Sequence, residues 1–249
     1  MPAGDAVALT GTAAPLVVSV HGGDVYFTAP RWPEPVNRAF DHAQLILANS
    51  AGTAAKVKAL GHEARVLHLG TDIPKAITRG RRPNTVVTLA HLVARKRHAD
   101  VIRAVAQLDG WRYLIVGDGP ERPALESLAK ELGADVEFTG QLPHDEAVRV
   151  MRECSVYAMP STDEAFGVAY VEAMAGALPA IGATGEPGPA EIESVALVDP
   201  GDIDALASAI EVAAGDDGSW ARSVAERFSW QACGEATVAA YDEVLDLAR

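Results

Sequence analysis

The chain has 249 residues, of which 49% are hydrophobic and 22% charged, and its formal net charge is −13. This length and composition are typical of a soluble α/β protein with one large domain or two small ones, able to bury a sizeable core. Such an acidic chain disfavours nucleic acid and anionic membranes as main partners, although local cations and helix N-termini can still hold a small anion.

The spacing of the cysteines and the composition of the N-terminal segment indicate in which cellular compartment the protein is expected. Cys154 and Cys233 lie in no C-x-x-C or Cys/His metal spacing, so two buried thiols in a reducing environment are expected. No apolar run is long enough to span a bilayer. The N-terminus lacks a basic stretch, and Gly11 and Pro15 interrupt its apolar residues, which disfavours a signal peptide. We therefore expect a cytoplasmic protein.

Short apolar runs alternate with amphipathic stretches, which predicts an α/β fold with parallel sheets. The expected strands are brief and mostly apolar, as strands covered on both faces are. They cover residues 16–20, 44–48, 65–68, 85–89, 113–116, 136–139, 156–159, 179–182 and 196–198.

Helices are expected between these strands. Ser50 is a candidate N-cap for the first, and Asp202 starts another that ends before Gly215. The expected helices cover residues 51–60, 99–108, 123–132, 146–154, 202–214 and about 230–247, with one more starting near Phe166 or Gly167.

A polar segment rich in helix-breaking and strand-breaking residues, 71–84, is the expected boundary between two domains. Three strands precede it and six follow it. Six strands with helices can close a Rossmann-type unit, whereas three cannot cover both faces of a sheet comfortably. This asymmetry predicts that part of the first domain is absent.

The stretch from Met159 to Met174 predicts a strand, a polar turn and a helix. Gly167 at the helix start lets a ligand approach the backbone, and the free N–H groups of the first turn favour phosphate. Glu172, inside the helix, can accept two hydroxyl donors, as a ribose diol would offer. Glu164, in the turn, is placed to bind sugar hydroxyls. We therefore expect this strand, turn and helix to hold a diphosphate between the carboxylates of Glu164 and Glu172.

This stretch resembles the E-x7-E motif of retaining glycosyltransferases with the GT-B fold, family 4 (glycosyl transferases group 1). Two Glu residues at this spacing are a weak signal alone, but Ser161, Phe166-Gly167, Glu172-Ala173 and a later Gly188-Pro-Ala-Glu-Ile192 widen the match. The resemblance implies donor contacts at Ala165, Phe166, Gly167, Val168 and Glu172, with Glu164 as a catalytic residue.

The resemblance also implies a domain plan. Residues 1–73 would be the C-terminal part of an N-terminal, acceptor-side Rossmann-like domain, truncated at its front. Residues 74–228 would be a complete C-terminal nucleotide-sugar-binding Rossmann-like domain. Residues 229–249 would be a helix that crosses back to the N-terminal part.

Residues 92–98 resemble the family's G-R-L-x-x-x-K-G segment, in which Arg and Lys bind the donor pyrophosphate. Lys96 occupies the Lys position, whereas His91 stands at the Arg position and Ala90 at the preceding Gly. Arg95 and Arg97 are both candidates to replace the missing cation, and a solvated basic turn is the alternative interpretation.

Two further turns contribute candidates. Gly117-Asp-Gly-Pro120 has too few glycines for a dinucleotide fingerprint, so it is interpreted as mainly structural, with a backbone contact at Gly119. Leu142 follows a strand whose loop contacts the nucleotide base in the family. His21, in the sequence His-Gly-Gly-Asp24, matches the family's H-G-x-D, where the His faces the donor sugar; a structural strand-end His is the alternative.

The function implied is metal-independent transfer of a sugar, with retention, from a UDP- or GDP-type nucleotide diphosphate sugar to an acceptor hydroxyl. His21, Glu164 and Lys96 would be catalytic, and no metal ligands or other cofactor are expected. The acceptor, whether carbohydrate, lipid-linked glycan or small molecule, stays open.

Two alternatives remain. One is a truncated or degenerate donor-binding fragment with little activity, whose open sheet edge could support self-association. The other is a nucleotide-sugar epimerase.

Overall fold

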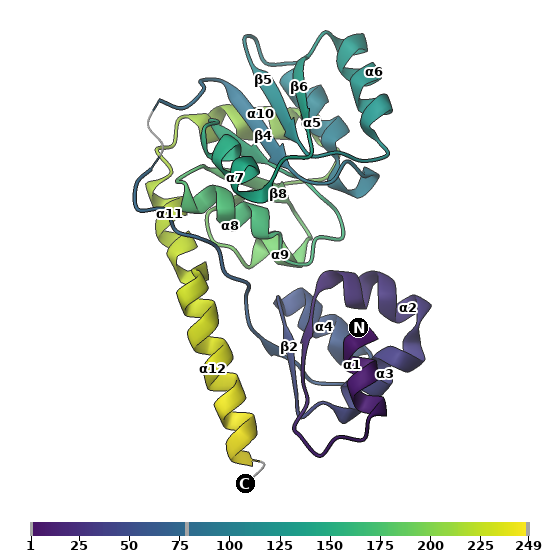
Figure 1. Ribbon diagram of the computed structural model, residues 1–249. Helices are drawn as coiled ribbons and strands as arrows, with labels where there is room; N and C mark the ends of the chain where they lie inside the picture. The colour runs from purple at the N-terminus through teal and green to yellow at the C-terminus, as the bar shows by residue number, and fades with distance from the viewer. Residues whose placement is uncertain (1, 78–79, 248–249) are drawn as a thin grey trace. The chain divides into compact units, whose positions relative to one another are not determined.

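The computed structural model describes residues 2–77 and 80–247 (Figure 1). The chain divides into two compact units. Unit 1 comprises Met1–Gly70, Glu164–Phe166 and Phe228–Arg249, and unit 2 comprises Thr71–Asp163 and Gly167–Arg227.

Unit 1 contains a three-stranded parallel sheet in the order β1-β2-β3, with β1 (Val17–Val20), β2 (Leu45–Ala48) and β3 (Arg65–Val66). Its core packs apolar side chains of the sheet against those of neighbouring helices, including Val20, Val36, Phe40 and Val57. The helical elements are α1 (Pro2–Leu9), the π-helix η1 (Gly23–Thr28), α2 (Ala29–Arg31), α3 (Pro33–His42), α4 (Ala51–Ala59) and α12 (Trp230–Leu247).

Unit 2 contains a six-stranded parallel sheet in the order β6-β5-β4-β7-β8-β9. In chain order from β4, this is the 3-2-1-4-5-6 arrangement of a Rossmann sheet. The strands are β4 (Thr85–Leu89), β5 (Arg112–Val116), β6 (Asp135–Gly140), β7 (Val156–Ala158), β8 (Ala180–Ala183) and β9 (Val195–Val198).

The sheet of unit 2 lies between two groups of helices (Figure 1). One group is α5 (His98–Val105), α6 (Arg122–Leu132) and α10 (Ile203–Ala214). The other is α7 (His144–Arg152), α8 (Val168–Ala175) and α11 (Ser219–Ala225). Short helical segments η2 (Ala94–Lys96) and α9 (Pro187–Ala190) complete the unit, and η3 (Glu226–Phe228) spans the boundary where unit 2 ends at Arg227. Because helices cover both faces, the middle strands are largely buried and mostly apolar.

The predicted fold class is confirmed: both sheets are parallel, and each expected strand is present within about two residues of its predicted ends. The predicted helix caps are also confirmed. The Ser50 hydroxyl accepts from the N–H of Thr53, and the Asp202 carboxylate accepts from the N–H of Ala205. These side chains satisfy first-turn donors that have no partner inside the helix.

Several helices were not predicted: α1, η1, α2, α3, α9 and α11. The signal in α3 was present, because Val36, Ala39 and Phe40 are buried at helical spacing. Its two prolines, Pro33 and Pro35, lie in the first turn, where no backbone N–H is needed for the helix.

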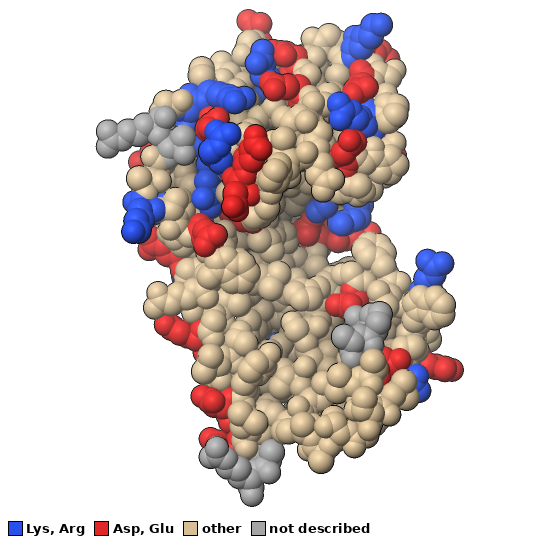
Figure 2. Space-filling view, in the orientation of Figure 1, with Lys and Arg blue, Asp and Glu red and all other residues tan. Residues whose placement is uncertain are grey.

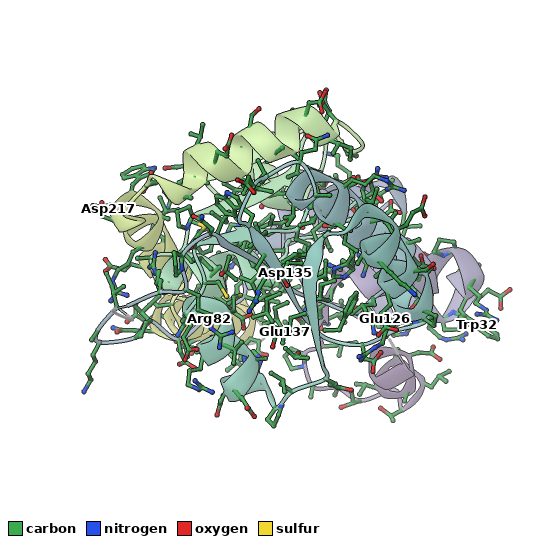
Figure 3. The ribbon with its side chains drawn as sticks, turned by 90° about the horizontal axis from the view of Figure 1, so that it is seen from above. Trp32, Arg82, Glu126, Asp135, Glu137 and Asp217 are labelled. Atoms are coloured by element: carbon green, nitrogen blue, oxygen red, sulfur yellow. The ribbon has the colours of Figure 1, made fainter. Side chains whose placement is uncertain are left out.

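The edge of the larger sheet carries charge. The edge strand β6 presents the acids Asp135 and Glu137 (labelled in Figure 3), and Arg112 on β5 lies 2.9 Å from Asp135 and 3.9 Å from Glu137. Charged side chains discourage strand pairing at an edge. On the face shown in Figure 2, basic and acidic side chains are interspersed over the described surface.

Among the described residues, no helix combines the length and apolar character needed to cross a membrane.

A buried polar network joins three strands of unit 2 to α5. The Thr88 hydroxyl contacts the Tyr113 hydroxyl (2.7 Å) and donates to the carbonyl of Ala158. Nδ1 of His98 lies 2.9 Å from the same Tyr113 hydroxyl. Burial lowers the pKa of His98 from 6.5 to about 4. The folded chain therefore holds His98 neutral at a pH where the unfolded chain takes up a proton.

We predict that this histidine makes unfolding pH-dependent. Between pH 6.5 and about 4 the unfolded chain binds one proton more at this site, so the unfolding free energy falls as pH falls, by on the order of 3 kcal/mol. Urea unfolding across this range should show a shallower slope for His98→Gln than for the parent chain. The exposed His42, replaced by Gln, is the control and should keep the parent slope. Equal slopes for the parent and His98→Gln would contradict the prediction.

Candidate functional site

The strand order of unit 2 places the candidate site. β4 and β7 are neighbours in the sheet, and the chain leaves them toward opposite edges. In open parallel sheets, ligands bind at such a reversal point, beyond the carboxyl ends of the strands. His91 follows β4, and the turn to α8 follows β7.

A cavity of about 670 Å³ lies at this edge of the sheet. It is bounded by the residues that follow β4, β5 and β6 and by one side of α8. Its lining includes four predicted donor-binding residues, His91, Gly119, Leu142 and Glu172, together with Ala90, Asp118, Gln141, His144 and Ala169. The structure thus brings together residues from four separate segments.

The glycine turn after β5 supports the loop after β4 by direct backbone contact. A Cβ on Gly117, which has φ +142°, would lie 2.1 Å from the carbonyl oxygen of Ala90. A Cβ on Gly119 would lie 2.4 Å from the carbonyl oxygen of Leu92. Only glycine allows these approaches, so the turn has the structural role expected of it, while the contact of Gly119 with a donor stays a prediction.

Lys96 ends the short helix η2 in the loop after β4. Its ammonium group lies 3.6 Å from the sulfur of Met159, at the end of β7. The next residue, Arg97, has φ +54°, at the position where the family segment carries Gly. Its guanidinium bonds the buried Asp100 at 2.6 Å. The Arg97 guanidinium is therefore paired within the first turn of α5, which makes it a poor substitute for the missing phosphate cation.

The helix after the Glu164 turn begins at Val168, so the expected start at Phe166 or Gly167 was early. Gly167 is the N-cap and has φ +81°. The first-turn N–H groups are those of Val168 and its successors, and Ala169 in this turn lines the cavity. Phe166 precedes the helix and is buried, its ring stacked on that of His68 at 5.2 Å.

Glu172 lies one turn further along α8 and is 8% exposed. Its Oε1 is 3.2 Å from Nε2 of His144, the first residue of α7. Burial raises the pKa of Glu172, while His144 and Arg152 lower it and Asp72 raises it. His144 was not among the predicted site residues, and its only signal in the sequence was its position two residues after Leu142.

Three arginines bind the carboxyl end of α8. Arg152 donates to the carbonyl of Glu172 (3.0 Å), and Arg222 donates to that of Ala175 (2.5 Å). Arg81 donates to the carbonyls of Gly176 and Ala177, both at 2.8 Å. The same Arg152 and Arg222 also bind the carbonyls of Asp72 and Pro74, so they join α8 to the segment before β4.

The remaining predicted residues belong to unit 1. His21 is exposed, and its backbone N–H donates to the Asp24 carboxylate at 2.9 Å. A Cβ on Gly22 would lie 2.4 Å from Cβ of Ala165, so the His-Gly-Gly-Asp turn packs against the segment that carries Glu164. Glu164 is 8% exposed. The catalytic roles of His21, Glu164 and Lys96 stay predictions.

The described residues contain no group of three or more His, Cys, Asp or Glu side chains placed to hold a metal ion.

These features define an α/β protein with a Rossmann-type sheet and a cavity at the carboxyl ends of its strands. The sequence model of the glycosyl transferases group 1 family matches residues 71–227. The chain belongs to this family.

Curated relatives agree with this assignment. The lipopolysaccharide core biosynthesis glycosyltransferase LpsE of Rhizobium meliloti is 31% identical over 193 residues, which is 72% of this chain and 56% of the relative. The D-inositol 3-phosphate glycosyltransferase of Mycolicibacterium smegmatis is 30% identical over 250 residues, 86% of this chain and 57% of the relative. The chain thus spans little more than half the length of these relatives.

Solved structures share the fold. HepE of Anabaena, crystallised with UDP, superposes with a TM-score of 0.84 at 24% identity, covering 97% of this chain and 76% of HepE. Sucrose-phosphate synthase of Thermosynechococcus elongatus gives a TM-score of 0.80 at 22% identity, covering 96% of this chain and 70% of the synthase. The GT-B-like fold class predicted from the sequence is confirmed.

The arginines at the end of α8 lead to a prediction about stability. Arg152→Met should lower the unfolding free energy by about 2–4 kcal/mol, because two carbonyls lose a charged donor in a half-buried place. Urea denaturation followed by circular dichroism measures this change. Arg149→Met on the same helix is the matched control. Its guanidinium forms an exposed pair with Glu153, so it should cost under about 1 kcal/mol. Equal losses for the two variants would refute a special role for Arg152.

Proposed function

We propose that this chain takes part in retaining, metal-independent transfer of a sugar from a nucleotide diphosphate sugar, as in family 4 of the glycosyltransferases. One observation carries the proposal: the first turn of α8 and the buried Glu172 line the same cavity at the carboxyl edge of the sheet. Helix N–H groups suit a diphosphate, and a carboxylate one turn further suits a ribose diol.

The donor would use the other walls of the cavity as follows. The base would contact the residues after β6, including Leu142, and the glycine turn after β5. Lys96 would supply charge to the diphosphate. HepE of Anabaena has been crystallised with UDP and with UDP-glucose, which supports a UDP-type donor, with GDP as the other candidate.

Negative charge develops on the diphosphate during the transfer step. The bond from the anomeric carbon to the diphosphate oxygen breaks as the acceptor oxygen bonds to that carbon from the same face. The departing phosphate oxygen takes the proton of the acceptor hydroxyl. Fixed dipoles at the N-terminus of α8 and the ammonium of Lys96 would stabilise the charge that builds on the diphosphate. Because these groups supply positive charge, the step needs no metal ion. The acceptor is a carbohydrate, lipid-linked glycan or small molecule bearing a hydroxyl.

A second candidate is a donor-binding protein with little transfer activity. It is favoured by His91, which stands where the family segment carries a phosphate-binding Arg. An imidazole cannot form the bidentate, permanently charged phosphate contact that a guanidinium forms.

Donor assays separate the two. UDP-glucose and GDP-mannose, incubated with the chain and a chelator, should release nucleotide and a sugar of unchanged anomeric configuration, detected by NMR. Binding without turnover would support the second candidate. Isomerisation of the donor sugar would indicate an epimerase instead.

Glu164→Gln tests the catalytic assignment. The substitution removes a negative charge and keeps the side-chain shape, so sugar release should fall at least about a hundredfold while the circular dichroism spectrum stays unchanged. Asp163→Asn is the matched control, because Asp163 is exposed and has φ +54°, which Asn tolerates. An unchanged rate in Glu164→Gln would remove Glu164 from the site.

Lys96→Ala tests the phosphate contact. Affinity for UDP or GDP, measured by calorimetry, should fall by roughly tenfold or more, as expected for loss of a charged hydrogen bond. Affinity for uridine or guanosine, which carry no phosphate, should change little. Equal losses for diphosphate and nucleoside would argue against a phosphate role.

A further inference from the structure

We infer that His144 fixes Glu172 as a hydroxyl acceptor and thereby sets a preference for ribonucleotides over 2′-deoxyribonucleotides. This inference rests on the proposed function, because it concerns the ribose end of the same cavity. The inference gives a role to His144, which lies on α7 and outside the motif that contains Glu172.

The geometry joins two elements across the cavity. His144 begins α7, and Glu172 lies in the second turn of α8, and both line the cavity. Nε2 of His144 is 3.2 Å from Oε1 of Glu172. The His144 side chain is 69% exposed and that of Glu172 is 11% exposed. Since the contact is made through Oε1, the second oxygen, Oε2, can accept from a ligand hydroxyl.

The charge state of Glu172 decides whether it can hold a diol. An ionised carboxylate accepts from two hydroxyls, whereas a protonated one presents a donor of its own. Burial and Asp72 raise the pKa of Glu172, and His144 and Arg152 oppose this. Arg152 uses its guanidinium on the backbone carbonyls of Glu172 and Asp72. His144 is therefore the group that meets the carboxylate itself.

The placement of His144 is not explained by the stability of α7. The N-terminus of a helix carries the positive end of its dipole and favours acidic side chains. The acids Asp145 and Glu146 in the same turn already satisfy that preference. The interaction that the structure shows for the His144 side chain is its contact with Glu172.

The ligand class that follows is a nucleoside diphosphate with a free ribose cis-diol. UDP and 2′-deoxy-UDP differ by one hydroxyl, and GDP and 2′-deoxy-GDP form an equivalent pair. The ratio of affinities within a pair measures the hydroxyl contact and cancels effects on the base, the diphosphate or the fold.

The experiment measures these ratios by calorimetry at pH 7 on the full chain. The parent should prefer the ribonucleotide by about tenfold, as expected for a hydrogen bond to a charged acceptor. His144→Ala should reduce the preference to about twofold or less, on the same energy scale. His144→Gln, which keeps a donor toward Glu172, should restore most of it. Asp145→Asn, a change in the same turn that does not line the cavity, should leave the ratio at the parent value.

A further variant distinguishes loss of the His144–Glu172 contact from loss of folding. His144→Glu introduces a residue type that suits a helix start, but it sets a like charge against Glu172, so the preference should vanish while circular dichroism shows a folded chain. If His144→Ala and His144→Glu keep the parent ratio, or weaken both nucleotides equally, the inference is overturned. If the parent binds neither pair, the proposed function fails instead.

Discussion

The position of α8 depends on three guanidinium groups at its carboxyl end. Arg81, Arg152 and Arg222 come from distant parts of the chain and bind the last carbonyls of this helix and the backbone just after it. Cations at the end of a helix offset its negative dipole end, and donors there satisfy carbonyls that have no partner within the helix. Two of them also bind the backbone of 72–74. The opposite end of α8 is thereby held at the cavity.

This anchoring matters because backbone groups form part of the candidate site. Gly117 and Gly119 touch the loop after β4, and Gly167 starts α8 in a left-handed conformation. Each contact fixes a stretch of main chain before any ligand arrives. Dipoles held in this way need no reorganisation when charge develops on a bound phosphate, which is the condition under which they stabilise it best.

Sequence patterns predicted the strands because buried parallel strands are short apolar runs between breakers, and they predicted Glu172 because it falls within a local motif. They could not predict His144, because its role comes from the packing of α7 against α8. Nor could they predict the three arginines, whose partners are carbonyl groups and leave no mark on side-chain spacing. The start of α8 was predicted near Phe166 or Gly167 and lies at Val168. A glycine such as Gly167 can start a helix or precede one, and only its φ of +81° decides between the two.

The departures from the family segment after β4 have a common physical consequence. His91 replaces an arginine and lines the cavity, while Arg97 turns to Asp100. The loop therefore offers Lys96 as its main fixed cation in a chain of net charge −13. A diphosphate that binds here must rely on the dipole of α8 more than on a surplus of cations. Dipolar contacts act over about one helical turn and are short-ranged compared with net charge, so a net charge of −13 is compatible with the proposed anion site at the N-terminus of α8.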